Sequence, residues 1–316
     1  MIKIVALVIA LSLVLTVAVP ALADKPEDSL WKTTPDDLPV LKMPWSPGAR
    51  GGEPGATPGK GKPDKPAPEP EVNKWAVIVG ISDYPGLESD LYNADDDAQE
   101  MRDALVTNYG FPEDNIKLLL DRKAKFRDIM GAIDWLADRE NADSSVVFFF
   151  CGHGFRRADA EGWDTDIEAD SNDEGIVSWD MYGLPDGMLR EKFAAFETNK
   201  LTMAFGSCFS GGMFDDDDDL QNVGRVIPAG CESYQYCWDY YGLGNTLFGY
   251  YFIDRGMLDQ VAAADADSDG TVSVEEAFEY ASIGVTSHYP PPPDPQDPDM
   301  SDMYLMPPDY LEDLVP

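Results

Sequence analysis

V-V-F-F-F-C-G-H-G, at residues 146–154, is an apolar run that ends abruptly at glycine and histidine. L-T-M-A-F-G-S-C-F-S-G-G, at residues 201–212, has the same form and ends around a cysteine. Short continuous apolar runs are typical of strands buried on both faces of a parallel sheet. Because ligands bind beyond the carboxyl ends of such strands, His153 and Cys208 meet at one rim if the strands are neighbours. A thiol beside an imidazole is the arrangement that nucleophilic catalysis by cysteine requires.

The segments around these two runs alternate between strand and helix patterns. Strands are predicted at 74–81, 116–120, 146–151, 200–206 and 222–229, helices at 94–107, 125–138, 185–197, 242–256 and 274–283, and an edge strand at 302–305. This order predicts an α/β fold, a three-layer α/β/α sandwich with a mostly parallel sheet. Residues 154–180 read as a long acidic loop. The chain has no Gly-x-Gly-x-x-Gly after its first strand and no Gly-Lys-Ser/Thr loop, so nucleotide binding is disfavoured.

A His-Gly pair after an apolar strand, followed some 55 residues later by Ser-Cys-x-Ser-Gly-Gly, resembles the caspase-like cysteine peptidases. That group includes caspases, metacaspases, prokaryotic caspase homologues and legumains, and the similarity runs roughly over residues 75–304. The resemblance implies a caspase-like fold and a cysteine-type endopeptidase. It assigns Cys208 as the nucleophile and His153 as the acid/base, with the backbone N–H groups of Gly154 and Cys208 as the oxyanion hole.

The chain departs from the family two residues before the cysteine. Metacaspases usually have Asp there and legumains have Glu, whereas this chain has Gly206. The departure removes the simplest reason to expect cleavage after Arg or Lys. Acidic residues in 164–180 or 215–219 are the alternative source of such a preference, and the general acidity of the chain favours cationic peptides.

Residues 265–276, D-A-D-S-D-G-T-V-S-V-E-E, match the calcium loop of an EF-hand. The predicted oxygen ligands are Asp265, Asp267, Asp269, the carbonyl of Thr271, and Glu276. Glycine stands at the sixth position, where the loop turns sharply. The pattern predicts one bound Ca²⁺ with a mainly structural role. A chance acidic turn is the alternative, because no clear helix pattern precedes the loop.

Charge and the amino-terminal sequence bear on location and partners. Among the 316 residues, 59 are acidic and 23 basic, and the net charge of −36 disfavours nucleic acid and anionic membranes as partners. Residues 1–23 have the charged start, apolar stretch and Ala21-Leu22-Ala23 ending of a signal peptide, which predicts a secreted or extracytoplasmic protein. Residues 24–73 read as a disordered Pro/Gly-rich linker or pro-segment, and residues 74–316 as the peptidase domain.

Of the four cysteines, Cys231 and Cys237 stand six residues apart and could form a disulfide in an exported protein, while Cys151 lies within a predicted buried strand. Three function classes remain open. One is a secreted cysteine endopeptidase that binds one Ca²⁺ and acts on peptide or protein substrates. The second is a catalytically silent, calcium-binding interaction module on the same fold. The third is a different thiol hydrolase or a transpeptidase on this scaffold. The sequence carries no signal for the oligomeric state.

Overall fold

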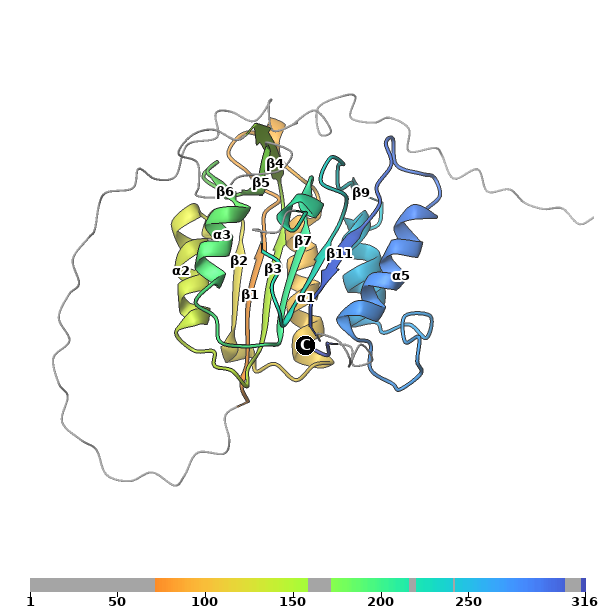
Figure 1. The fold of residues 1–316 in the computed structure, drawn as a ribbon. Helices are drawn as coiled ribbons and strands as arrows, with labels where there is room; N and C mark the ends of the chain where they lie inside the picture. The colour runs from red at the N-terminus through yellow and green to blue at the C-terminus, as the bar shows by residue number, and fades with distance from the viewer. Residues whose placement is uncertain (1–71, 159–171, 216–219, 241, 305–313) are drawn as a thin grey trace, which may run out of the picture.

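The central feature of the computed structural model is a six-stranded sheet with the order β11-β8-β7-β3-β1-β2 (Figure 1). The structure describes residues 72–158, 172–215, 220–240, 242–304 and 314–316. The strands of this sheet are β1 Lys74–Gly80, β2 Ile116–Leu120, β3 Ser145–Cys151, β7 Leu201–Gly206, β8 Arg225–Ala229 and β11 Asp299–Asp302. Neighbouring strands from β2 to β8 pair in parallel, and β11 pairs antiparallel with β8.

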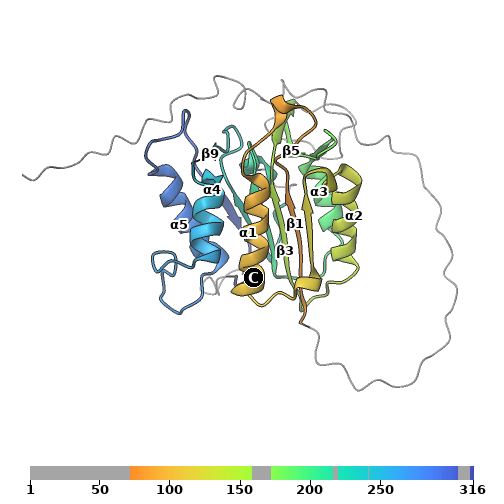
Figure 2. The same cartoon turned by 180° about the vertical axis from the view of Figure 1, so that it is seen from behind.

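Helices cover both faces of this sheet. One face carries α2 Phe126–Ala137 and α3 Asp186–Phe193. The other carries α1 Ala94–Thr107, α4 Leu247–Gly249, its π-helical continuation η5 Tyr250–Leu258, and α5 Val274–Thr286. Figure 2, seen from behind, shows α1, α4 and α5 in front of the strands. The predicted three-layer sandwich is therefore confirmed.

Strand β1 shows why both faces need a cover. Val77 and Val79 pack into the apolar cluster beneath α2 and α3, whereas Ala76 and Ile78 pack into the cluster beneath α1 and η5. All four side chains are fully buried. Successive strand residues point to opposite faces, so a continuous apolar run is stable only between two layers of helices.

A second, smaller sheet contradicts one sequence prediction. β4 Gly154–Ala158 and β5 Asn172–Val177 lie in the stretch 154–180 that the sequence presented as an acidic loop, and they form an antiparallel sheet with β6 Gly183–Pro185. Each strand contributes a buried apolar residue, namely Phe155, Ile176 and Leu184. Residues 159–171 lie outside the described residues. The strands are short and have no clear alternation of apolar and polar residues, so the sequence did not indicate them.

Several element ends also differ from prediction. The helix expected at 185–197 already ends at Phe193, and the helix expected at 242–256 begins only at Leu247. The edge strand lies at Asp299–Asp302 rather than at 302–305. A short hairpin of β9 Asp239–Tyr240 and β10 Asn245–Thr246 precedes α4. None of the helices in the described ranges is long and apolar enough to cross a bilayer. The signal-peptide prediction lies outside the described residues.

Candidate active site

The register between β3 and β7 brings the two predicted catalytic residues to one edge of the sheet. The strands are neighbours and parallel, and their last paired residues are Cys151 and Gly206. His153 stands two positions beyond Cys151, and Cys208 stands two positions beyond Gly206. Both residues therefore leave the sheet at its carboxyl end from adjacent strands, where open α/β sheets bind their ligands.

Gly154 lies directly against the backbone of Cys208. A Cβ atom at Gly154 would be 2.0 Å from the Cys208 carbonyl oxygen and 3.2 Å from its nitrogen. No side chain fits there, which explains the glycine after His153. The Val177 N–H donates to the His153 carbonyl at 2.9 Å. Successive N–H groups of an antiparallel strand point to opposite sides of that strand. The N–H of Gly154, which follows His153, therefore points away from β5.

His153 is held by a carbonyl and an aromatic ring. Its Nε2 lies 2.8 Å from the Ser89 carbonyl oxygen, and its ring centroid is 4.7 Å from that of Tyr84. A carbonyl only accepts hydrogen bonds, so Nε2 carries the proton and Nδ1 keeps a lone pair. The side chain is only 5% exposed. Burial lowers the pKa of His153 to about 4, so the imidazole is neutral near neutral pH.

Cys208 stands in the turn between β7 and the 3₁₀ helix η4 Ser210–Met213. The next residue, Phe209, has a left-handed backbone with φ 63, and its N–H donates to the Gln235 carbonyl at 2.9 Å. Cys208 is half-buried, and its Sγ lies 3.8 Å from the Cys237 carbonyl oxygen. Burial raises the pKa of Cys208 to about 11. Near neutral pH the thiol of Cys208 and the imidazole of His153 are therefore both neutral.

The other three cysteines line the same end of the sheet. Cys151 is buried, and its thiol donates to the Gly206 carbonyl and to Asp97 Oδ2, at 3.3 Å in each case. Cys231 is also buried, and its thiol donates to the Ser207 carbonyl at 3.4 Å. All four cysteines are free, so the disulfide predicted between Cys231 and Cys237 is not formed.

Asp97 is a buried acid next to this site that sequence reasoning missed. It is fully buried and accepts hydrogen bonds from Asn245 Nδ2 at 3.0 Å and from Thr246 Oγ1 at 2.6 Å. Burial raises the pKa of Asp97 to about 8, so the carboxyl is mostly protonated at neutral pH. The run Asp95–Asp96–Asp97 resembles a solvated first turn of a helix. The available signal was the spacing from Asp97 to Met101, which places both residues on one face of α1.

Three of the five predicted calcium ligands come together in one loop. Carboxylate oxygens of Asp265, Asp267 and Asp269 lie within 4.8 Å of one another. Glu276 Oε1 accepts the N–H groups of Ala266 at 2.8 Å and of Asp267 at 3.1 Å, so this carboxylate faces the loop. Its pKa is lowered, because these bonds and those from Ser273 outweigh the effect of burial, which raises it.

The backbone of the loop also follows the motif, with one exception. Gly270 has φ +92, and its N–H donates to Asp265 Oδ2 at 3.2 Å. Thr271 is half-buried in the loop, and Ser273 and Glu276 form the capping box that begins α5. The exception is the entering helix, because residues 259–264 separate η5 from Asp265. The motif is therefore a loop followed by a helix, without the adjoining first helix of an EF-hand.

Comparison with known proteins points to one family. The sequence model of the family described as "Caspase domain" matches residues 73–283. Curated relatives include Metacaspase-4 of Arabidopsis thaliana, 31% identical over 46% of this chain and 35% of its own length, and Metacaspase-3 of the same plant, 35% identical over 37% and 32%. Metacaspase-1 of Plasmodium falciparum is 34% identical over 34% of this chain and 18% of its own length. The chain thus matches about a third of the first relatives' length.

A crystal structure of a protein from Geobacter sulfurreducens has the same fold, with a TM-score of 0.53 and 16% sequence identity. The match covers 72% of this chain and 92% of that one. Because the family model spans more than half of the chain and the sheet topology agrees with it, this chain belongs to the caspase domain family.

Proposed function

We propose that this protein is a cysteine-type endopeptidase that cleaves peptide or protein substrates, with Cys208 as the nucleophile and His153 as the acid/base. The observation that carries the proposal is the close approach of Gly154 to the Cys208 backbone at the end of two adjacent strands. Membership of the caspase domain family supports a cysteine peptidase as well.

The hydrogen bonds of His153 define its role in the reaction. With Nε2–H donating to the Ser89 carbonyl, Nδ1 is the nitrogen that accepts the thiol proton as Cys208 Sγ forms a bond to the substrate carbonyl carbon. The negative charge moves to the substrate oxygen, and the proposal assigns the N–H groups of Gly154 and Cys208 as the donors that stabilise it. When the peptide C–N bond breaks, the imidazolium returns its proton to the leaving amine, and a thioester remains on Cys208.

Water completes the cycle. His153 Nδ1 removes a proton from a water molecule, the hydroxide attacks the thioester carbonyl, and the C–S bond breaks. Cys208 then recovers its proton from the imidazolium. Burial of His153 and Cys208 disfavours a thiolate–imidazolium pair before substrate is bound. We therefore infer that substrate binding triggers the transfer of the thiol proton to the imidazole.

Gly206, two residues before the proposed nucleophile Cys208, affects the expected specificity. A Cβ atom at Gly206 would be 3.1 Å from Cys151 Sγ. Cys151 is held by its bonds to Gly206 and Asp97, so an acidic side chain at position 206 requires repacking of this thiol. This supports a peptidase whose preference for cationic peptides arises from its overall charge of −36 rather than from residue 206.

The test is a peptide-library digest by the mature chain, read by mass spectrometry of the products. We expect Cys208→Ala to abolish cleavage and His153→Ala to reduce it by at least ~10²-fold, the usual contribution of a general acid/base. Cys231→Ala is the matched control, since it removes a buried thiol of the same region and leaves Cys208 in place. Turnover by the Cys208→Ala protein refutes the assignment. An iodoacetamide label on Cys208 that does not depend on His153 favours the silent interaction module.

We also propose that the loop 265–276 binds one Ca²⁺ through Asp265, Asp267, Asp269, Glu276 and the carbonyl of Thr271. The supporting observations are the convergence of the three Asp carboxylates and the Glu276 carboxylate, which accepts backbone N–H groups of the same loop. Hard oxygen ligands around a tight turn suit this ion. At a free Ca²⁺ concentration of a hundred times the Kd, binding adds about 2.7 kcal/mol to the free energy of unfolding.

Thermal unfolding with CaCl₂ or with a chelator tests the calcium proposal independently of activity. We expect Ca²⁺ to raise the Tm of the mature chain, and Asp265→Asn and Glu276→Gln to abolish that increase. Glu279→Gln is the matched control, because it removes one exposed carboxylate from the same helix, α5. Equal Ca²⁺ responses in all variants exclude the site. For the proposed export, the amino terminus of the secreted protein should be Asp24, as Edman sequencing will show.

A further inference from the structure

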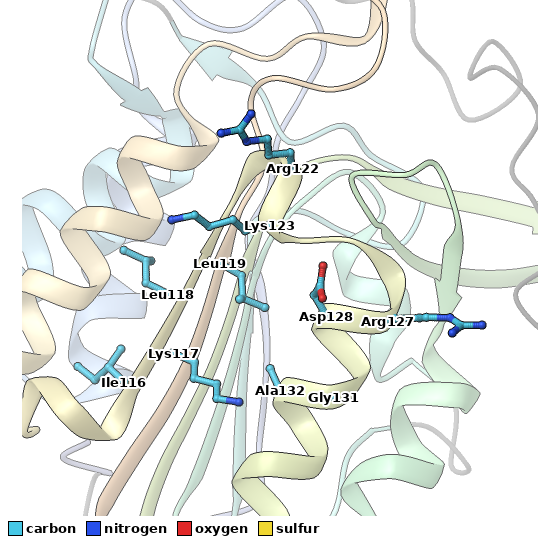
Figure 3. A pocket seen from close by; sticks show the side chains of 10 residues that line it. All are labelled: Ile116, Lys117, Leu118, Leu119, Arg122, Lys123, Arg127, Asp128, Gly131 and Ala132. Atoms are coloured by element: carbon cyan, nitrogen blue, oxygen red, sulfur yellow. The ribbon is translucent and has the colours of Figure 1, made fainter. Parts of the chain in front are cut away.

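A groove of about 870 Å³ runs along the outer edge of β2 and over α2. Figure 3 shows its lining side chains, which come from β2, from the turn after it and from α2. Leu118, Leu119 and Ala132 supply apolar surface. Gly131 leaves room in the groove, since no atom lies within 4 Å of a Cβ placed there.

The charge of this groove is opposite to that of the whole chain. Four cationic residues and one acidic residue line it, namely Lys117, Arg122, Lys123, Arg127 and Asp128. The chain as a whole carries −36. β2 is the last strand of the sheet and pairs only with β1 among the described strands, so the backbone of its outer edge pairs with no described strand. Exposed strand edges are commonly covered or protected in folded proteins.

The amino-terminal part of the chain joins the domain beside this edge. The Val72 carbonyl accepts a hydrogen bond from Asn115 Nδ2 at 3.1 Å, and Asn115 immediately precedes β2. The described chain therefore begins beside the amino end of β2, and residues 24–71 precede it in the sequence. An extended chain spans about 3.3 Å per residue, so a segment of this length reaches the whole groove.

One part of this extension matches the groove in chemistry. Residues 35–45, P-D-D-L-P-V-L-K-M-P-W, combine two adjacent carboxylates with apolar residues. Pro39 and Pro44 bias the residues before them toward an extended backbone, which suits a groove along a strand. A second copy of the chain fits less well, because pairing two β2 edges brings the same cations, such as Lys117, opposite each other.

We propose that residues 35–45 of this chain dock in the β2-edge groove, with Asp36 and Asp37 against its cations and the apolar residues over Leu119 and Ala132. The segment then covers the open sheet edge and ties the amino-terminal extension to the peptidase domain. Charged side chains on an edge strand also serve simply to prevent pairing, and the experiment has to separate these two roles.

The first experiment is zero-length carbodiimide cross-linking of the mature Cys208→Ala chain, in which self-cleavage cannot remove the segment. The reagent activates a carboxylate, and a neighbouring amine displaces it to form an amide. We expect links from Asp36 or Asp37 to Lys117 or Lys123 within the monomer, identified by mass spectrometry. Links spread evenly over the acids of residues 24–71, or links found only in a dimer, overturn the proposal.

Variants of the segment and of the groove test the docking directly. The pair Asp36→Lys and Asp37→Lys should raise deuterium exchange of the amides of residues 116–120, whereas Asp64→Lys with Glu69→Lys, an equal charge change in the same extension, should leave it unchanged. Gly131→Leu fills the groove without altering any charge and should remove the cross-links. Identical deuterium exchange in the unmodified protein and in both double variants refutes docking. None of these measurements requires peptidase activity, so they are independent of the proposed function.

Discussion

Gly154→Ala tests the contact on which the proposed site depends. The new methyl carbon would lie 2.0 Å from the Cys208 carbonyl oxygen and 3.1 Å from the carbonyl carbon. An ordinary carbon–oxygen contact is about 3.3 Å, so the two backbones have to separate by more than 1 Å. Both partners are backbone and cannot rotate away. A 1 Å error in the position of catalytic groups can reduce a rate by ~10²-fold, and overpacking costs about 1–3 kcal/mol.

We therefore expect Gly154→Ala to lower kcat/KM on the peptide library by ~10²-fold or more and to reduce the free energy of unfolding by about 2–3 kcal/mol. Urea unfolding measures the stability, and initial rates on the preferred peptide measure the activity. Gly131→Ala is the matched control, since its Cβ meets no atom within 4 Å and it lies inside α2. It should be stabilising by up to ~1 kcal/mol, as expected for Ala replacing Gly in a helix. A folded Gly154→Ala enzyme with activity within about threefold of the unmodified protein would refute the site geometry, because the separation it imposes should cost ~10²-fold.

Three further outcomes follow from buried titratable groups. Asp97, with its pKa raised by burial to about 8, binds a proton that the unfolded chain releases near pH 4, so stability should fall as pH rises between these values. Asp97→Asn should remove up to ~1.4 kcal/mol per pH unit of that slope in urea unfolding, and an unchanged slope contradicts the reasoning. His153, with its pKa lowered by burial to about 4, should put the acidic limb of the kcat/KM profile near pH 4, and a limb near pH 6.5 excludes a buried catalytic imidazole. Arg225 is buried and donates to the carbonyls of Leu220 and Phe193, so Arg225→Met should cost about 2–4 kcal/mol in urea unfolding by leaving both without their donor, whereas a cost below ~0.5 kcal/mol would show that water replaces it.

Local patterns in the sequence were sufficient to predict most helices and strands of the three layers. The helix Ala94–Thr107 and the strand Ile116–Leu120 have the predicted ends, because their apolar periodicity and their terminating residues lie within the segment itself. The two apolar runs that end at His153 and Cys208 indicated strands buried on both faces. Their position in a parallel sheet followed from the alternation of strands and helices.

Strand pairing, by contrast, was decided by tertiary structure. The sequence contains both runs but does not say that β3 and β7 are neighbours in the register Cys151 to Gly206, which places His153 and Cys208 at the same edge of the sheet. The antiparallel sheet β4-β5-β6 could not be seen in the same way, since its strands are short and become stable only by pairing.

The amino-acid sequence by itself indicated the fold class, the candidate residues His153 and Cys208 and the acidic loop 265–276, because each rests on local patterns: apolar runs, helical periodicity and short motifs. Only the tertiary structure decided that Asp97 is buried under Asn245 and Thr246, almost 150 positions along the chain, and that Gly154 touches Cys208. Burial and contact between distant residues depend on how whole layers pack, and packing is a property of the assembled chain.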